Sequence, residues 1–138
     1  MVEMELNKIV IDEKRHDQLI VLKEKGGPRI LPIVIGLNEA SAIKLKISGF
    51  QPPRPLTHDL LHSTIENLEA NIDKVIIDKL EESTFHAKLV IKTQSGETKV
   101  IDARPSDSIA LAVRAHAPIF AEDEVIKQSE VFNKKPLE

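Results

Sequence analysis

The sequence has no cysteine, no tryptophan and no tyrosine, and only four phenylalanines among its 138 residues. Without cysteine, the chain has no disulfide bonds, no cysteine-bound zinc and no thiol nucleophile. So few aromatic rings disfavour a protein that stacks single-stranded bases on aromatic side chains. No apolar run approaches the ~20 residues of a membrane-spanning helix, and the acidic, alternating N-terminus is unlike a signal peptide. We therefore expect a cytoplasmic protein that makes no contact with a membrane.

An excess of basic charge is also lacking. The formal net charge is −3, with 19 Lys and Arg against 22 Asp and Glu. This balance argues against tight, salt-driven, non-specific binding to nucleic acid, although a local basic face is compatible with it. The apolar fraction of 41% and the charged fraction of 30% are ordinary for a globular protein. A chain of this length is large enough for one hydrophobic core.

Hydrophobic periodicity predicts one α+β domain over residues 1–138, with a core at about 3–127 and a frayed C-terminal tail. We expect a twisted, mixed or antiparallel sheet of about six strands, with three or four helices. Strands are expected at residues 2–11, 19–22, 29–35, 74–80, 85–93 and 98–102, and helices at 37–49, 57–71, 105–116 and from 122 onward. A short extended piece is expected from Pro118. Pro32 donates no ladder hydrogen bond, so the third strand lies at an edge or carries a bulge.

The second predicted helix has a clear start and a clear apolar spacing. Thr57 is its expected N-cap, because a threonine side chain accepts a hydrogen bond from an early helical N–H. Leu61, Ile65 and Leu68 follow at helical spacing and are therefore expected to form its buried face.

Two histidines lie one helical turn apart in the segment 58–62 (His-Asp-Leu-Leu-His). This spacing lets both bind one metal ion, as in metalloproteases with the sequence His-Glu-x-x-His. That motif needs a glutamate as general base after the first histidine, and the shorter Asp59 stands there instead. The sequence also fixes no third ligand. Boundary histidines that pair with glutamates one turn away are the favoured interpretation.

The segment 102–107 (Asp-Ala-Arg-Pro-Ser-Asp) joins a predicted strand to a predicted helix. Its carboxylates could hold Mg²⁺, and Arg104 could hold a phosphate with help from the helix N–H groups. A structural alternative is equally concrete. Pro105 suits the first helical position, and Ser106 and Asp107 satisfy early N–H groups and the helix dipole. Capping leaves Arg104 unexplained unless it pairs with Asp102, so both interpretations stay open.

Two further features also have structural interpretations. Glu39 near the start of the first predicted helix suits the helix dipole, and this role is favoured over metal binding. The helix at 105–116 is apolar on nearly every side, so it is either central in the domain or covered by another subunit. We expect a homo-oligomer, with a dimer as the preferred state.

Three segments taken together resemble the bifunctional nuclease domain family. They are residues 31–36 (LPIVIG) with Glu39 and Ala40, residues 54–61 (RPLTHDLL) and residues 102–119 (DARPSDSIALAVRAHAPI). The resemblance extends over about residues 3–127, and the last segment is the most specific. It implies an α+β domain with a twisted mixed sheet that assembles as a homo-oligomer. It also implies nuclease activity on DNA and RNA, as in plant members.

The resemblance transfers eight motif residues to a candidate site. They are Glu39, Arg54, Thr57, His58, Asp59, Arg104, Ser106 and Asp107. We expect His58, Asp59, Asp107 and Arg104 to act in catalysis, Arg54, Thr57 and Ser106 to contact the substrate, and Asp59, Asp107 and Glu39 to bind Mg²⁺ or Mn²⁺. His62 is not part of the family pattern, which usually has leucine there. This departure weakens the hypothesis of a two-histidine zinc site.

Two functions are therefore compatible with the sequence. The first is a metal-assisted phosphodiesterase that cleaves DNA or RNA, with His58 as base or ligand, because histidine titrates near neutral pH. The second is a non-catalytic oligomeric module that binds a partner protein or a small anion, which fits the acidic balance and the helix capping. Convergence of residues 54–59 and 104–107 on one cleft would favour the enzyme. Positions on opposite faces, or pairing only with each other inside the core, would favour the module.

Overall fold

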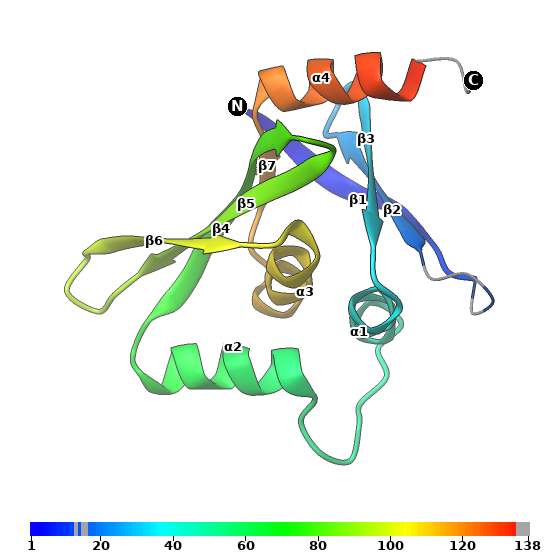
Figure 1. Cartoon of the computed structure of the whole chain (residues 1–138). Coiled ribbons are helices and arrows are strands. Elements are labelled where there is room, and N and C mark those ends of the chain that lie inside the picture. The colour runs from blue at the N-terminus through cyan, green and yellow to red at the C-terminus, as the bar shows by residue number, and fades with distance from the viewer. Residues whose placement is uncertain (13, 15–16, 135–138) are drawn as a thin grey trace.

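One curled, mixed sheet and three helices surround a central helix, α3 (Figure 1). The computed structural model describes residues 1–12, 14 and 17–134, and these form a single α+β domain. In chain order the elements are β1 (Val2–Val10), β2 (Gln18–Glu24), β3 (Ile30–Ile35), α1 (Leu37–Ile47), α2 (Thr57–Asn67), β4 (Asn71–Glu81), β5 (Thr84–Lys92), β6 (Thr98–Ala103), α3 (Pro105–Ala115), β7 (Ile119–Ala121) and α4 (Asp123–Lys134). From residue 135 onward, the tail that was expected to fray lies outside the described residues.

The described residues form seven strands in the order β3-β2-β1-β7-β4-β5-β6, one more than the six expected. The extra strand is β7, which was expected only as a short extended piece. It pairs antiparallel with β1 and parallel with β4, so it joins the N-terminal half of the sheet to the C-terminal half. Three residues are too few to give the alternation by which a strand is recognised in sequence.

The edge position of β3 confirms the prediction made from Pro32. β3 is the first strand of the sheet and pairs antiparallel with β2 alone, with Pro32 opposite Val21. A proline is tolerated there because one edge of the strand has no strand partner to which it must donate a hydrogen bond. β6 forms the opposite edge of the sheet and pairs with β5.

Helix α3 is buried within a single chain. It packs against α1, α2, β4 and β5, and Ile109, Ala110 and Leu111, which point in three directions around the helix, are each at most 2% exposed. The apolar character of this helix had two possible explanations, a central position in the domain or a second subunit. The central position of α3 accounts for it. The homo-oligomer stays a prediction with no support from α3.

Helix α2 differs from its prediction in two ways. Leu56 and not Thr57 is the N-cap residue, so Thr57 is the first helical residue. Of the expected buried face, only Ile65 is buried, whereas Leu61 is 44% exposed and Leu68 is 75% exposed. Spacing predicts which residues share a face but not how much of that face a neighbour covers. Here α2 lies at the margin of the domain, below α3 (Figure 1).

No helix in the described part of the chain has the length and apolar character needed to cross a membrane.

Candidate functional site

The junction between β6 and α3 positions two of the candidate residues. β6 ends at Ala103, Arg104 is the N-cap of α3 in an extended conformation, and Pro105 is its first helical residue. Proline suits this position because its fixed φ is helical and the N–H that it lacks would have no partner in the helix. Asp107 then lies in the first turn, where a carboxylate interacts favourably with the helix dipole. The positions of Pro105 and Asp107 follow the structural interpretation, but no side-chain cap hydrogen bond forms at this helix start, and the oxygens of Asp107 bind the side chains of His58 and Arg104 instead of early N–H groups.

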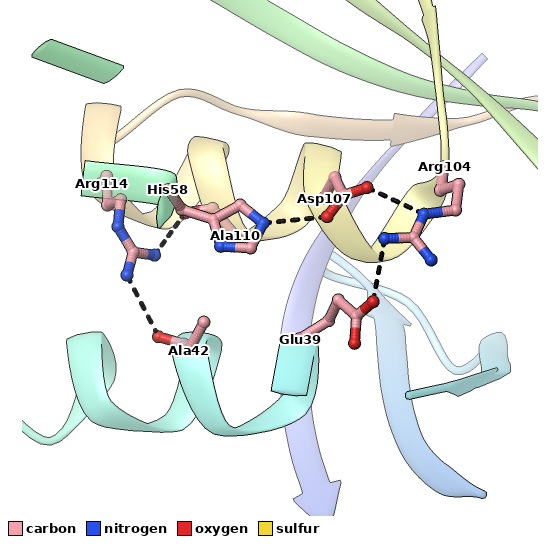
Figure 2. Close-up of polar contacts among 7 residues, drawn as sticks. All are labelled: Glu39, Ala42, His58, Arg104, Asp107, Ala110 and Arg114. Atoms are coloured by element: carbon pink, nitrogen blue, oxygen red, sulfur yellow. Dashed lines mark hydrogen bonds and ion pairs between the residues drawn. The ribbon is translucent and has the colours of Figure 1, made fainter. Parts of the chain in front are cut away.

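Four side chains from three parts of the chain form one line of polar contacts (Figure 2). His58 Nε2 on α2 lies 2.9 Å from Asp107 Oδ1. Arg104 Nε donates to Asp107 Oδ2 at 2.8 Å, and Arg104 Nη2 donates to Glu39 Oε1 at 2.8 Å. Arg104 therefore binds two carboxylates, and Asp107 connects Arg104 to His58.

These residues line one open cleft of about 610 Å³, which we call the histidine cleft. Its walls come from one side of α1, from the start of α2 with the two residues before it, and from the start of α3. They are Asn38, Glu39, Ser41, Ala42, Leu45, Pro55, Leu56, Thr57, His58, Arg104 and Asp107. Residues 55–58 therefore meet Arg104 and Asp107 of the 104–107 turn in one cleft, which is the arrangement that favours the enzyme, although both ends of the segment 54–59 lie outside it.

The charges in the cleft are partly buried and mutually neutralised. Burial opposes ionisation of Asp107, but hydrogen bonds from Arg104 and His58 outweigh it and hold the pKa of the carboxyl below its ordinary value. The hydrogen bond between Arg104 and Asp107, together with the one to Glu39, raises the pKa of the Arg104 guanidinium. The side chains of His58 and Glu39 are 12% and 16% exposed, whereas that of Arg104 is 65% exposed. Arg104 is therefore the group of this line most accessible to a ligand.

Asp59 does not join the histidine cleft. Its Oδ1 accepts a hydrogen bond from Arg114 Nε at 2.7 Å, and its Oδ2 accepts one from the Leu56 backbone N–H at 2.9 Å. Burial acts to raise the pKa of Asp59, but the Leu56 N–H and Arg114 prevail, so its pKa is lowered. Both oxygens of Asp59 are thus engaged in holding the start of α2 against α3.

Arg114 is the residue of this region that sequence reasoning missed. Its side chain is 3% exposed, and it also donates to the carbonyl oxygens of Ala110 and Ala42, at 2.8 and 3.4 Å. Ala110 belongs to the same helix, and Ala42 belongs to α1, as Figure 2 shows. The available signal was a lone arginine in an apolar helix, because a buried cation requires a paired acid.

The remaining candidates lie in three different places. Thr57 lines the histidine cleft. Arg54 lines a neighbouring cavity of about 390 Å³, together with Asp59 and Arg114. Ser106 is only 5% exposed and lines a third cavity, on the other side of Arg104. The structure therefore brings Glu39, Thr57, His58, Arg104 and Asp107 together, and places Arg54, Asp59 and Ser106 outside this cleft.

The two histidines of α2 have separate partners. His58 contacts Asp107, whereas His62 Nε2 lies 3.6 Å from Glu66 Oε1, one turn further along the helix. The pairing of His62 with a glutamate is the interpretation that the sequence favoured. Asp102, at the end of β6, is 78% exposed and pairs with Lys88 at 3.2 Å instead of with Arg104.

The donor set of the histidine cleft suits a hard divalent cation better than zinc. Within the described ranges, no three His, Asp or Glu side chains are arranged to hold a metal ion together. Glu39 and Asp107, however, both reach the cleft through their contacts with one guanidinium. Mg²⁺ commonly binds one or two carboxylates and keeps several waters, so the oxygen donors of Glu39 and Asp107 are of the kind that it prefers.

Comparison with known proteins places the chain in a family. The model of the bifunctional nuclease domain matches residues 20–134. An uncharacterized protein of Mycobacterium tuberculosis is 40% identical over 94% of this chain and 76% of its own length. Bifunctional nuclease 2 of Oryza sativa subsp. japonica is 29% identical over 79% of this chain. Bifunctional nuclease 1 of Arabidopsis thaliana is 23% identical over 78% of it.

The matched region is 34% of each of these two plant proteins, so the chain corresponds to about a third of their length. The family model, in contrast, matches most of this chain and includes all the residues of the histidine cleft. The chain therefore belongs to the bifunctional nuclease domain family.

Proposed function

We propose that the histidine cleft hydrolyses phosphodiester bonds of DNA or RNA. The observation that carries this proposal is the line from His58 through Asp107 and Arg104 to Glu39, within one open cleft. In this line a histidine, a carboxylate, an arginine and a second carboxylate each lie within hydrogen-bonding distance of the next, which supports roles in proton transfer and anion binding. Membership of the bifunctional nuclease domain family supports the assignment of substrate class.

His58 and Asp107 form the proton-transfer pair of the proposed mechanism. A carboxylate that accepts a hydrogen bond from one ring nitrogen of a histidine fixes the tautomer and leaves the other nitrogen as an acceptor. The contact of His58 Nε2 with Asp107 assigns that acceptor role to Nδ1. His58 then removes the proton from the attacking water or hydroxyl. Asp107 keeps the ring oriented and stabilises its protonated form.

Arg104 binds the phosphate. A guanidinium offers a planar fork of donors that matches two phosphate oxygens, and its attraction strengthens as negative charge grows in the transition state. The Arg104 side chain is the most exposed of the line, and its Nη1 makes no hydrogen bond with any described residue. In Figure 2 this third nitrogen points away from both carboxylates. A phosphate can therefore bind Arg104 without first displacing Asp107.

A divalent cation, Mg²⁺ or Mn²⁺, completes the proposal, with Glu39 and Asp107 as its protein ligands. When bound, it would polarise the phosphoryl oxygens and neutralise developing charge. In the arrangement described here Arg104 neutralises the same two carboxylates, so cation binding requires Arg104 to turn toward the phosphate. Asp59 is a weaker ligand candidate than the sequence indicated, because it lies outside the histidine cleft and pairs with the buried Arg114.

A second candidate function is a non-catalytic module that binds a small anion. The observation in its favour is that both oxygens of Asp107 are engaged, by His58 and by Arg104, while Arg104 stays exposed. Such a module would bind phosphate through Arg104 without turnover. The two candidates therefore differ in cleavage and not in anion binding.

One experiment separates them. The purified protein is incubated with supercoiled plasmid and with single-stranded RNA in Mg²⁺ or Mn²⁺, beside His58→Ala, Asp107→Asn and the control His62→Ala. We expect losses of about 10²-fold or more in the first two variants, the usual contribution of a proton-transfer group. His62→Ala should keep full activity, because His62 lies one turn away and outside the cleft.

Cleavage that persists unchanged in both site variants would overturn the assignment and indicate a contaminating nuclease. A wild-type protein that binds phosphate but cleaves neither substrate would establish the module instead.

A further inference from the structure

A second cavity lies on the other side of Arg104. It has a volume of about 520 Å³, within the range of small-molecule sites, and we call it the β3 groove. Residues 32–35 of β3 form one wall, Phe85 of β5 forms another, and α3 contributes Ser106. The groove exists because the sheet curls, which brings the β4–β5 turn and α4 close to β3 (Figure 1).

The two cavities share one charged residue, Arg104. It lines both the histidine cleft and the β3 groove. A phosphate bound to this guanidinium therefore has the proton-transfer pair on one side and an apolar groove on the other. In a nucleic acid every internal phosphate is flanked by two nucleosides, so one of them can extend from Arg104 into the groove.

The lining of the β3 groove suits a neutral, largely apolar ligand with some polar atoms. Ile33 and Ile35 are buried in its wall, and Val34 offers an exposed apolar side chain. Phe85 offers an aromatic ring, and an aromatic ring stacks on any base. Asp17 also lines the groove, and its negative charge disfavours a second phosphate there. A nucleobase with its sugar matches this combination better than a polyphosphate or a fatty acid.

Ser106 supplies a polar group at the end of the groove nearest to Arg104. It is 95% buried, it lines the β3 groove, and its hydroxyl makes no hydrogen bond within the described part of the chain. The fully buried side-chain atoms without a partner in the described part of the chain are Asp78 Oδ1 and Ser108 Oγ, so the Ser106 hydroxyl keeps some exposure at the groove, where a ligand can reach it. A ligand with donor and acceptor atoms at this end of the groove would satisfy Ser106.

We propose that the β3 groove binds the nucleoside attached to the phosphate that Arg104 holds, with Ser106 as a hydrogen-bonding partner of that nucleoside. This proposal rests on the proposed function of the histidine cleft, because both share Arg104. The protein would then recognise one nucleoside next to the scissile phosphate. Apolar contacts in the groove, and not the net charge of the protein, would provide this recognition.

The test is an amide NMR titration of the intact protein with three probes: adenosine 5′-monophosphate, inorganic phosphate and adenosine. We expect the monophosphate to shift the amide signals of Val34, Phe85 and Ser106, and inorganic phosphate to act only around Arg104. The monophosphate should bind about tenfold more tightly than inorganic phosphate, the gain expected from one stacked base. Equal affinities, or a monophosphate that leaves the groove signals unmoved, would overturn the proposal.

Two matched variants show whether the β3 groove itself is the binding site. Val34 and Val100 are 61% and 59% exposed and lie on the two opposite edge strands of the sheet, β3 and β6. Val34→Asn should bring the affinity ratio of monophosphate to inorganic phosphate close to one, and Val100→Asn should leave it unchanged. A ratio that both variants keep would contradict the groove as the binding site.

Cleavage assays on the same samples keep the two proposals distinct. A protein that binds the monophosphate in the groove but cleaves no nucleic acid would overturn the proposed function alone. A protein that cleaves but shows no response in the groove would overturn only the nucleoside site.

Discussion

Arg114 on α3 binds Asp59 on α2, with Arg114 Nε 2.7 Å from Asp59 Oδ1. The arginine side chain is 3% exposed, and its remaining nitrogens donate to carbonyl oxygens of α3 and α1. One buried guanidinium thus ties together the three helices whose N-termini line the histidine cleft. This contact shows a structural role for Asp59, whereas the roles in catalysis and metal binding that the sequence suggested stay predictions.

The first prediction concerns the stability of this contact. Asp59→Asn should lower the free energy of unfolding by about 3 kcal/mol, because it leaves a buried guanidinium without its charged partner. Urea unfolding followed by circular dichroism measures the change. Asp102→Asn is the control, since Asp102 is 78% exposed and forms an ion pair with Lys88. Similar losses in both variants would show that the Arg114 contact adds nothing special to stability.

The second prediction concerns acid. The pKa of Asp107 is lowered in the folded protein, because hydrogen bonds from Arg104 and His58 outweigh the opposing effect of burial. As the pH falls, the Asp107 carboxylate is therefore protonated in the unfolded chain before it is protonated in the folded protein, at an unfolded-state pKa of ~3.9. The contribution of Asp107 to stability is complete above that pH and is lost as the pH falls through the lower, folded-state pKa. Asp107→Asn removes the titrating group, so the difference in melting temperature between wild type and variant should shrink from pH 7 to pH 3. A constant difference would exclude this linkage.

The third prediction concerns the geometry of Arg104. Arg104→Lys keeps the positive charge but loses the planar fork, so it should lower phosphate affinity and cleavage by about tenfold or more. Because the side chain is 65% exposed, the fold should be unaffected. Arg29→Lys is a matched control, since Arg29 also binds two carboxylates, Glu24 and Asp123, outside the cleft. Equal losses of activity in the two variants would argue against a specific role for Arg104.

The fourth prediction concerns the divalent cation. Chelation with EDTA should abolish cleavage, and Mn²⁺ should broaden the NMR signals of residues around Glu39 and Asp107. Glu39→Gln should raise the cation concentration needed for half-maximal activity by about tenfold, the usual scale for loss of one contributor to a metal site. Glu66→Gln is the control, because Glu66 is 61% exposed and pairs with His62 instead. Full activity in EDTA would rule out the cation as part of the mechanism.

The fifth prediction concerns self-association. The sequence predicts a dimer, and α2 exposes Leu60 and Leu68 to 61% and 75%. If a second copy covers this face, Leu60→Glu with Leu68→Glu should convert a dimer into a monomer in sedimentation velocity. Val131→Glu, on α4, serves as a control for an exposed apolar residue elsewhere, at 64% exposure. A wild-type protein that sediments as a monomer at all concentrations would contradict the expected dimer.

The sequence predicted features that depend on neighbouring residues in the chain. Alternation located most strands to within a few residues, Pro32 placed β3 at an edge, and Pro105 marked the start of α3. The motifs that resemble the bifunctional nuclease domain family predicted a membership that the family model confirms. Each of these signals is local or is repeated along the chain, so no knowledge of packing was needed.

Only the tertiary structure decided which carboxylate contacts which histidine or arginine. His58 and Asp59 are adjacent in the sequence, but consecutive side chains on a helix point about 100° apart. His58 therefore faces Asp107 in the histidine cleft, while Asp59 turns back toward the Leu56 N–H and Arg114. Periodicity gives the direction of a side chain around its own helix, and the packing of α1, α2 and α3 determines what that side chain meets.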